Sequence, residues 1–183
     1  MLTVKQKNNM LLVSDKIQLR SVNLEDVNNT YVGWMKDTEV NQYMETRFRE
    51  QTQDTIAAYV ENMLSNSNIF FFAMIDHASG NHIGNIKLKI NQFHKRGEIS
   101  LFIGERDFWG MGIATVAIEL VRDFALNQLG LHKLSAGCYS NNIGSIRAFE
   151  KAGFKREAVL KEEYLFKDMW VDRYCYAFIA SAD

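Results

Sequence analysis

The sequence contains no proline, no internal repeat and no low-complexity segment, and its two cysteines are too few for a disulfide framework. Nothing therefore argues for dividing its 183 residues into more than one domain, here taken as 1–183. No apolar run reaches the roughly 18–20 residues that a membrane helix needs. The N-terminal segment lacks the apolar stretch and cleavage site of a signal peptide. These absences predict a soluble, reduced, cytoplasmic protein, although a bridge between Cys138 and Cys175 stays open.

The sequence also lacks an excess of either charge, because 21 basic and 22 acidic residues leave a formal net charge of −1. Nucleic acid selects strongly basic faces, so neither nucleic acid nor a membrane is expected as a partner. The four histidines show no metal-ligand spacing and no Cys-x-x-Cys occurs, so no metal is expected. A phosphate-bearing cofactor remains compatible with this balance, since backbone N–H groups hold phosphate without any net positive charge.

Hydrophobic periodicity predicts a meander of strands followed by strand–helix–strand units. This order gives a mixed α/β sheet, mostly antiparallel, with helices on both faces. The expected strands are a short one at Ile17–Val22, then 69–75, 82–90, 98–103, 133–139, 155–163 and 169–179. The expected helices are 24–35 with Asn23 as N-cap, 52–64, a long one from Ile113 that ends at Gly130 as C′ residue, and 142–152 closed by Gly153.

Two glycines, Gly110 and Gly112, lie where a strand ends and the long helix begins. Glycine lets the backbone turn tightly. The first amides of a helix have no intrahelical partner and point outward at the positive end of the helix dipole. Such a terminus favours a diphosphate. The loop matches neither the P-loop pattern nor the dinucleotide G-x-G-x-x-G, because Thr115 stands at the third small position. Kinase-like and dehydrogenase-like functions are therefore disfavoured.

The stretch ERDFWGMGIATVAIELVRDFAL resembles motif A of the GNAT (GCN5-related N-acetyltransferase) family, whose acetyl-CoA loop follows Q/R-x-x-G-x-G/A. Gly112 and Ala114 fill the small positions, and Trp109 replaces the usual Gln or Arg. Residues 142–154 are similar to the N-x-x-S-x-x-x-[YF]-E-K-x-G-F signature of the branch that resembles ribosomal-protein-alanine acetyltransferases. The two motifs occur in the family's order and spacing.

The resemblance implies a GNAT-like fold, with the sheet splayed between strand 98–103 and strand 133–139 around acetyl-CoA. Pantetheine would pair with backbone near Phe102 and Ile103. Asn142 is either only an N-cap, with Ser145 at N3, or also a contact to CoA or substrate. The cofactor-binding residues implied in this way are Phe102, Ile103, Trp109, Gly110, Met111, Gly112, Ile113, Ala114, Thr115, Asn142 and Arg147. A homodimer paired through edge strands is implied by analogy alone.

Direct transfer needs a neutral amine, and an α-amine with a pKa of about 7.7–8.0 requires only a modest base. Glu98 is the candidate base, because it opens the strand leading into the loop and matches a position where relatives carry a catalytic glutamate. The proton donor stays open among Tyr139, Ser145, a water and unaided thiolate departure, since Phe149 stands where many relatives have tyrosine. An acyl-cysteine at Cys138 is a minor alternative, because a strand cysteine is usually buried packing.

The family's acceptor site is usually built from the first two helices and the last hairpin. The residues expected to bind the acceptor are Trp34, Tyr43, Glu45, Arg47 and Tyr164, with Arg47 contacting an acidic group of the acceptor. The acceptor is either a small primary amine, such as an amino sugar or a polyamine, or a protein N-terminal α-amine. The sizeable loop near residues 43–50, part of the 37–50 segment between the first two helices, could cover a compact site and so favours the small molecule. A CoA-binding regulatory protein without turnover is the alternative from another class, which Phe149 favours and Glu98 opposes.

Overall fold

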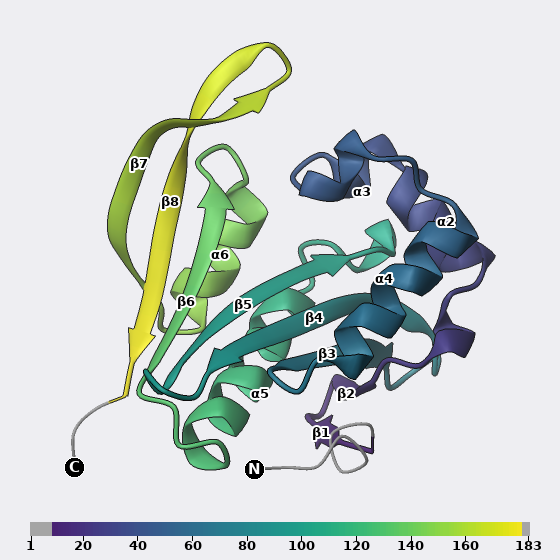
Figure 1. Cartoon of the computed structure of the whole chain (residues 1–183), viewed down its shortest axis with the longest axis horizontal. Helices are drawn as coiled ribbons and strands as arrows, with labels where there is room; N and C mark the ends of the chain where they lie inside the picture. Colours follow the sequence, from purple (N-terminus) through teal and green to yellow (C-terminus); the bar gives the residue numbers. More distant parts are fainter. Residues whose placement is uncertain (1–8, 181–183) are drawn as a thin grey trace.

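The computed structural model describes residues 9–180, which form one eight-stranded sheet (Figure 1). Its strand order is β1-β2-β3-β4-β5-β6-β8-β7, and all neighbours are antiparallel except β5 and β6, which run parallel. In chain order the strands are Leu11–Val13 (β1), Ile17–Ser21 (β2), Ile69–Asp76 (β3), His82–Asn91 (β4), Arg96–Ile103 (β5), Lys133–Tyr139 (β6), Lys155–Phe166 (β7) and Met169–Ile179 (β8). The predicted mixed, mostly antiparallel sheet is confirmed.

Helices cover both faces of this sheet, as the pattern predicts. They are the 3-10 turn Leu24–Asp26 (η1), Asn29–Lys36 (α2), Thr38–Asn41 (α3), the 3-10 turn Glu45–Phe48 (η2), Gln53–Ser65 (α4), the 3-10 turn Arg106–Phe108 (η3), Ile113–Asn127 (α5) and Ile143–Lys151 (α6). No helix within residues 9–180 has the length and apolar content needed to cross a bilayer.

Strand β3 shows why both faces are covered. Its run IFFFAMID is buried at every position. Successive side chains alternate between the faces, so Phe70 and Phe72 pack on the α5 side while Phe71 and Ala73 pack against α2 and α4. A strand buried on both faces reads as a continuous apolar run. The run in β3 is therefore explained by helices that cover both of its faces.

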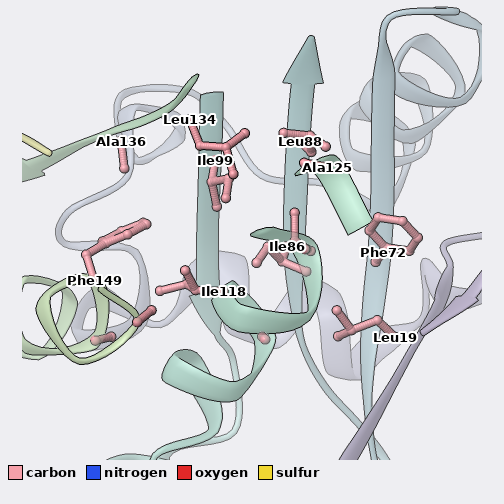
Figure 2. Packing of buried hydrophobic residues seen from close by; sticks show 14 of the residues in the cluster. Leu19, Phe72, Ile86, Leu88, Ile99, Ile118, Ala125, Leu134, Ala136 and Phe149 are labelled. Carbon is pink, nitrogen blue, oxygen red and sulfur yellow. The ribbon is translucent and has the colours of Figure 1, made fainter. Parts of the chain in front are cut away.

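Helix α5 seals one face through the stripe predicted from its sequence. Ile113, Ala117, Val121 and Phe124 are buried in the cluster that also contains β4, β5 and β6 side chains. Figure 2 shows this cluster, with Ile118 of α5 among the labelled residues. Side chains at this spacing lie on one side of a helix, so α5 is anchored along its length and its first turn has a fixed position.

The predicted helix 24–35 is wrong as one element, because it is broken into η1 and α2. Asn23 caps η1 as expected, but Val27 leaves helical geometry. The Asn28 side chain then accepts hydrogen bonds from the amides of Thr30 and Tyr31 and starts a second helix. An asparagine that caps the next turn competes with helix continuation, which is the physical reason for the break. Sequence periodicity also missed β1, α3, η2 and η3.

Gly130 does not occupy the predicted C′ position. Helix α5 ends at Asn127 with Gln128 as its C-cap, so Gly130 lies one residue further along. Its φ of 62° turns the chain back, and the Leu131 amide donates to the Ala125 carbonyl. The end of α6 agrees better with the prediction, because Gly153 follows its C-cap with a φ of 85°.

The parallel strands β5 and β6 pair over only three residues. Arg96, Gly97 and Glu98 face Lys133, Leu134 and Ser135, and no pair follows in the described chain. Figure 1 shows the two strands running apart from these paired ends, with β6 following β8 away from β5. The sheet is therefore splayed at the predicted place.

Candidate functional site

The splay between β5 and β6 opens a cleft of about 1240 Å³. Pockets for single small ligands are typically about 300–1,000 Å³. One wall consists of β5 and the first turn of α5, a second consists of β6 and the first turns of α6, and the 37–50 loop adds a third. The cleft therefore has room for a large cofactor together with an acceptor.

The loop at the start of α5 forms an open cradle of backbone amides. Gly110 and Gly112 have φ angles of 78° and 82°, and a Cβ on either would meet no atom within 4 Å. The amides of Ile113, Ala114 and Thr115 lie in the first helical turn, where they have no intrahelical acceptor. That turn carries no acidic side chain. The positive end of the α5 dipole, the amides without intrahelical acceptors and the open space at the two glycines together fit a diphosphate.

Most of the predicted cofactor residues in this region line the cleft, and Met111 does not. The cleft-lining ones are Phe102, Ile103, Trp109, Gly110, Gly112, Ile113, Ala114 and Thr115. The Trp109 indole N–H donates to the Ile103 carbonyl at 3.0 Å and so ties the cradle to the end of β5. Met111 is 60% exposed and does not line the cleft.

The start of α6 faces the cradle from the other wall. The Asn142 side chain accepts from the Ser145 amide at 3.1 Å, so the predicted N-cap with Ser145 at N3 is confirmed. Asn142, Ser145 and Arg147 all line the cleft, and Lys151 lies one turn beyond Arg147 on the same side. A contact from any of them to CoA stays a prediction.

Cys138 is the thiol nearest the splay, and its environment keeps it protonated. It is buried in the α5-side cluster, and its Sγ lies 3.2 Å from the Ser145 Oγ. Burial, the largest effect, raises the pKa of this thiol to about 11. A thiol must ionise to act as a nucleophile, so this setting opposes an acyl-cysteine route. Cys175 is also a free cysteine.

Glu98 stands where the two strands part. Its neighbour Ile99 is buried on the α5 side, so Glu98, Ser100 and Phe102 share the opposite face, as predicted from strand alternation. Glu98 is exposed and lines the cleft. Within residues 9–180 its carboxylate has no ion-pair partner within 4.0 Å. It is thus free to accept a proton from a group held in the cleft.

A hydrogen-bonded network joins four predicted residues from distant parts of the chain. The Tyr139 hydroxyl donates to Glu45 Oε1 at 2.7 Å and accepts from Arg47 Nη1 at 2.9 Å. Its ring stacks on Tyr164 with centroids 3.9 Å apart. Burial first, and then the bond to Glu45, raises the pKa of Tyr139 to about 12. Tyr139 therefore keeps its proton near neutral pH and directs it at Glu45.

A family model described as an acetyltransferase (GNAT) domain matches residues 16–155. The chain belongs to the GNAT acetyltransferase family. It is therefore an acetyltransferase, and the resemblance of residues 105–126 and 142–154 to the family motifs is confirmed at the level of the superfamily. The ribosomal-protein-alanine branch stays a prediction.

Relatives of this GNAT domain carry the same general name. The uncharacterized N-acetyltransferase p20 of Bacillus licheniformis is 28% identical over 92% of this chain and 95% of its own length. The probable N-acetyltransferase YjcK of Bacillus subtilis (strain 168) is 38% identical over 40% of this chain and 41% of that relative. The crystal structure of a Vibrio cholerae spermidine N-acetyltransferase in complex with CoA and spermine shares the fold, with a TM-score of 0.79, 21% identity, and 91% and 96% of the two chains covered.

Two of the predicted acceptor residues do not line the cleft of this acetyltransferase. Trp34 is buried beneath it and donates from its indole N–H to Glu105 Oε1 at 2.9 Å. It packs on Gly104 so closely that a Cβ there would approach Trp34 Cδ2. The Arg47 guanidinium donates hydrogen bonds within the protein, to the Tyr139 hydroxyl and to the backbone carbonyls of Met44 and Leu165. Tyr43, Glu45 and Tyr164 do line the cleft.

Two polar residues that line the cleft of this GNAT domain, Asn85 and Arg173, were not among the residues predicted from the sequence. Asn85 is 1% exposed, and its Nδ2 has no hydrogen-bond partner within the described chain. A polar residue in the middle of the apolar strand 82–90 was a usable signal for it. Arg173 had no comparable signal, because alternating polar residues on a strand are usually a solvated face.

Arg47→Ala is expected to raise the KM for the acceptor about tenfold, by roughly 1.4 kcal/mol. The guanidinium holds the 37–50 loop onto β6 and β7, so its loss frees Glu45 and Tyr139 from their present positions. Arg47→Lys is expected to rescue little, because an ammonium cannot reproduce the planar fork. Steady-state kinetics with a saturating acetyl donor measures both values. An unchanged acceptor KM would show that Arg47 does not position the acceptor-binding residues.

Proposed function

We propose that this chain transfers an acetyl group from acetyl-CoA directly to the primary amine of a small molecule, such as an amino sugar or a polyamine. The observation that carries the proposal is the cleft itself, which joins the α5 cradle on one side to Glu98 and the 37–50 loop on the other. Family membership supplies the reaction class, and the cleft supplies a place where donor and acceptor can meet.

The residues of the cleft fit acetyl-CoA, which supplies an activated acetyl thioester when bound. Gly110 and Gly112 leave open space in front of the first amides of α5, where a diphosphate would rest. Arg147 and Lys151 add positive charge on the facing wall. Past Glu98 the inner edge of β5 has no strand partner in the described chain, which leaves backbone groups for pantetheine.

Glu98 would take the proton that the attacking amine must lose, directly or through one water. The amine nitrogen forms a bond to the acetyl carbon, the carbon–sulfur bond breaks, and the thiolate that leaves takes up a proton. The high pKa of Cys138 and its burial favour this direct route over an acyl-cysteine. Tyr139 and Ser145 remain candidates to return the proton, although the Tyr139 proton is already directed at Glu45.

The 37–50 loop supports a small acceptor rather than a protein N-terminus. Glu45 and Tyr43 of this loop are bonded across to β6 and the start of α6, through Tyr139 and the Asn141 carbonyl. The loop is thus tied across the splay by two hydrogen bonds, which favours a small acceptor over a peptide. The structural neighbour from Vibrio cholerae, a spermidine N-acetyltransferase in complex with CoA and spermine, also agrees with a small-molecule amine rather than a protein.

The test is thiol release by purified protein mixed with acetyl-CoA and a panel of amines. Small amines, a peptide with a free N-terminus and its N-blocked counterpart are compared at equal concentration. Release that depends on one of the small amines, with the acetylated product found by mass spectrometry, is the expected result. Release with the free peptide alone would replace the small acceptor by a protein N-terminus. Binding of acetyl-CoA without release for any amine would favour the regulatory alternative.

A further inference from the structure

Arg173 of β8 places a guanidinium in the cleft that no other described group neutralises. The residue lines the cleft, and within residues 9–180 its side chain has no ion pair within 4.0 Å and no hydrogen bond. Its Nε is buried and lacks a partner. Leaving a buried donor of a charged group without a hydrogen bond costs free energy. An anion bound in the cleft would supply the missing acceptor.

The chain is built to hold this guanidinium against the splayed strand. Arg173 pairs with Tyr139 in the β6–β8 ladder, and its neighbours Tyr174 and Tyr176 pack on the α5 side. Arg173 therefore faces the acceptor side with Tyr139. Gly137 lies beneath it, and a Cβ there would come within 2.7 Å of Arg173 Nε and 2.9 Å of Nη2. The absence of a side chain at position 137 gives the guanidinium its space.

None of the carboxylates that line the cleft forms an ion pair with Arg173 within residues 9–180. Glu39 accepts from Arg106 at 2.7 Å, and Glu45 accepts from Tyr139. Glu50 and Glu98 make no ion pair with Arg173 within 4.0 Å in the described chain. The charge of Arg173 therefore acts on whatever enters the cleft, and it already lowers the pKa of Tyr164 against the larger effect of burial, which raises it.

We propose that Arg173 binds an oxyanion group of the acceptor, so that the preferred substrate is a primary amine that carries a carboxylate or a phosphate. A guanidinium forms two parallel hydrogen bonds to either group, and this geometry fixes orientation as well as affinity. A polycationic acceptor such as spermine would instead meet an unpaired like charge here. This inference rests on the proposed function, which it deepens by naming the acceptor class.

The test compares matched acceptors that differ in one anionic group. Glucosamine 6-phosphate is compared with glucosamine for the phosphate source, β-alanine with β-alaninamide for the carboxylate source, and spermidine serves as the polycation. We expect the kcat/KM of the anionic member of one pair to exceed that of its neutral partner at least tenfold. In Arg173→Gln this ratio falls to near one, because the KM of the anionic acceptor rises, and the acetyl-CoA dissociation constant stays close to its original value.

Two further variants make the result specific. Gly137→Ala inserts a methyl group under the guanidinium and displaces it, so the ratio is expected to fall in the same direction but less. Arg96→Gln removes an equal charge from an exposed position outside the cleft and is expected to keep the ratio of the original chain. Thermal melting of each variant separates a lost preference from a lost fold.

Three results would overturn the inference: spermidine or a neutral amine as the best acceptor, an equal fall of kcat for all acceptors in Arg173→Gln, or a weakened acetyl-CoA affinity. The last two would assign Arg173 to transfer or to the cofactor. Calorimetric binding of glucosamine 6-phosphate to the protein with CoA gives a readout without turnover. Arg173-dependent binding without turnover for any amine contradicts the proposed function alone, and turnover without an anionic preference contradicts the inference alone.

Discussion

Glu98→Gln is expected to lower turnover about a hundredfold near neutral pH, while the affinity for acetyl-CoA changes little. The amide keeps the size of the side chain and its place at the parting of β5 and β6, but it cannot accept the amine proton. Glu98 lies on the face of β5 opposite α5, so we expect the substitution to leave the shape of the α5 cradle unchanged. Stopped-flow thiol release and calorimetric titration of the same protein sample measure the two quantities.

The pH dependence of this defect separates a base from a structural glutamate. At a pH well above the pKa of the acceptor amine, the amine is already neutral and needs no base, so the gap between Glu98→Gln and the original chain should narrow. Glu61→Gln on α4 is the control, because Glu61 is exposed and lies outside the cleft. An equal defect at every pH, or none at neutral pH, would remove Glu98 as the base.

Gly112→Val is expected to weaken acetyl-CoA binding at least tenfold. The φ of 82° at this N-cap lies in the left-handed region, which costs a side chain about 1–2 kcal/mol and a β-branched one more. The added side chain would also occupy the open space in front of the first amides of α5. Both effects act on the diphosphate cradle, so the dissociation constant should rise while the fold survives.

Gly80→Val is the matched control for this change. Gly80 has a φ of 71°, and a Cβ there also meets nothing within 4 Å, but it lies in the turn between β3 and β4, away from the cleft. Both variants should lose similar stability in thermal melting, and only Gly112→Val should lose acetyl-CoA affinity. Equal loss of affinity in both would mean that backbone strain, rather than the cradle, explains the result.

Local patterns in the sequence were enough to predict most elements and the loop and helix starts that line one side of the cleft. The stripe from Ile113 to Phe124 and the cap at Asn142 are short-range signals, and both helices begin where those residues indicate. The tight turn at Gly110 and Gly112 likewise follows from the residue type at these two positions, because glycine adopts positive φ angles without strain. These features depend on neighbours within a few positions, which a sequence displays directly.

The acceptor side depended on contacts that a sequence does not display. Trp34 looked like an acceptor residue by its position, but the close approach of Gly104 holds it in the core. Arg47 looked free, but Tyr139 and Leu165, about a hundred positions away in the chain, take its donors. Arg173 was overlooked because its space depends on Gly137, the neighbour that only the β6–β8 register reveals.

Acetyl-CoA binding at the α5 cradle is tested most directly by a calorimetric titration of the original chain and of Gly112→Val with acetyl-CoA. We predict saturable binding at one site per chain for the original protein, and markedly weaker binding for the variant. Absence of binding to the original protein would contradict the proposed function, because the loop from Trp109 to Thr115 would then be only a turn between a strand and a helix.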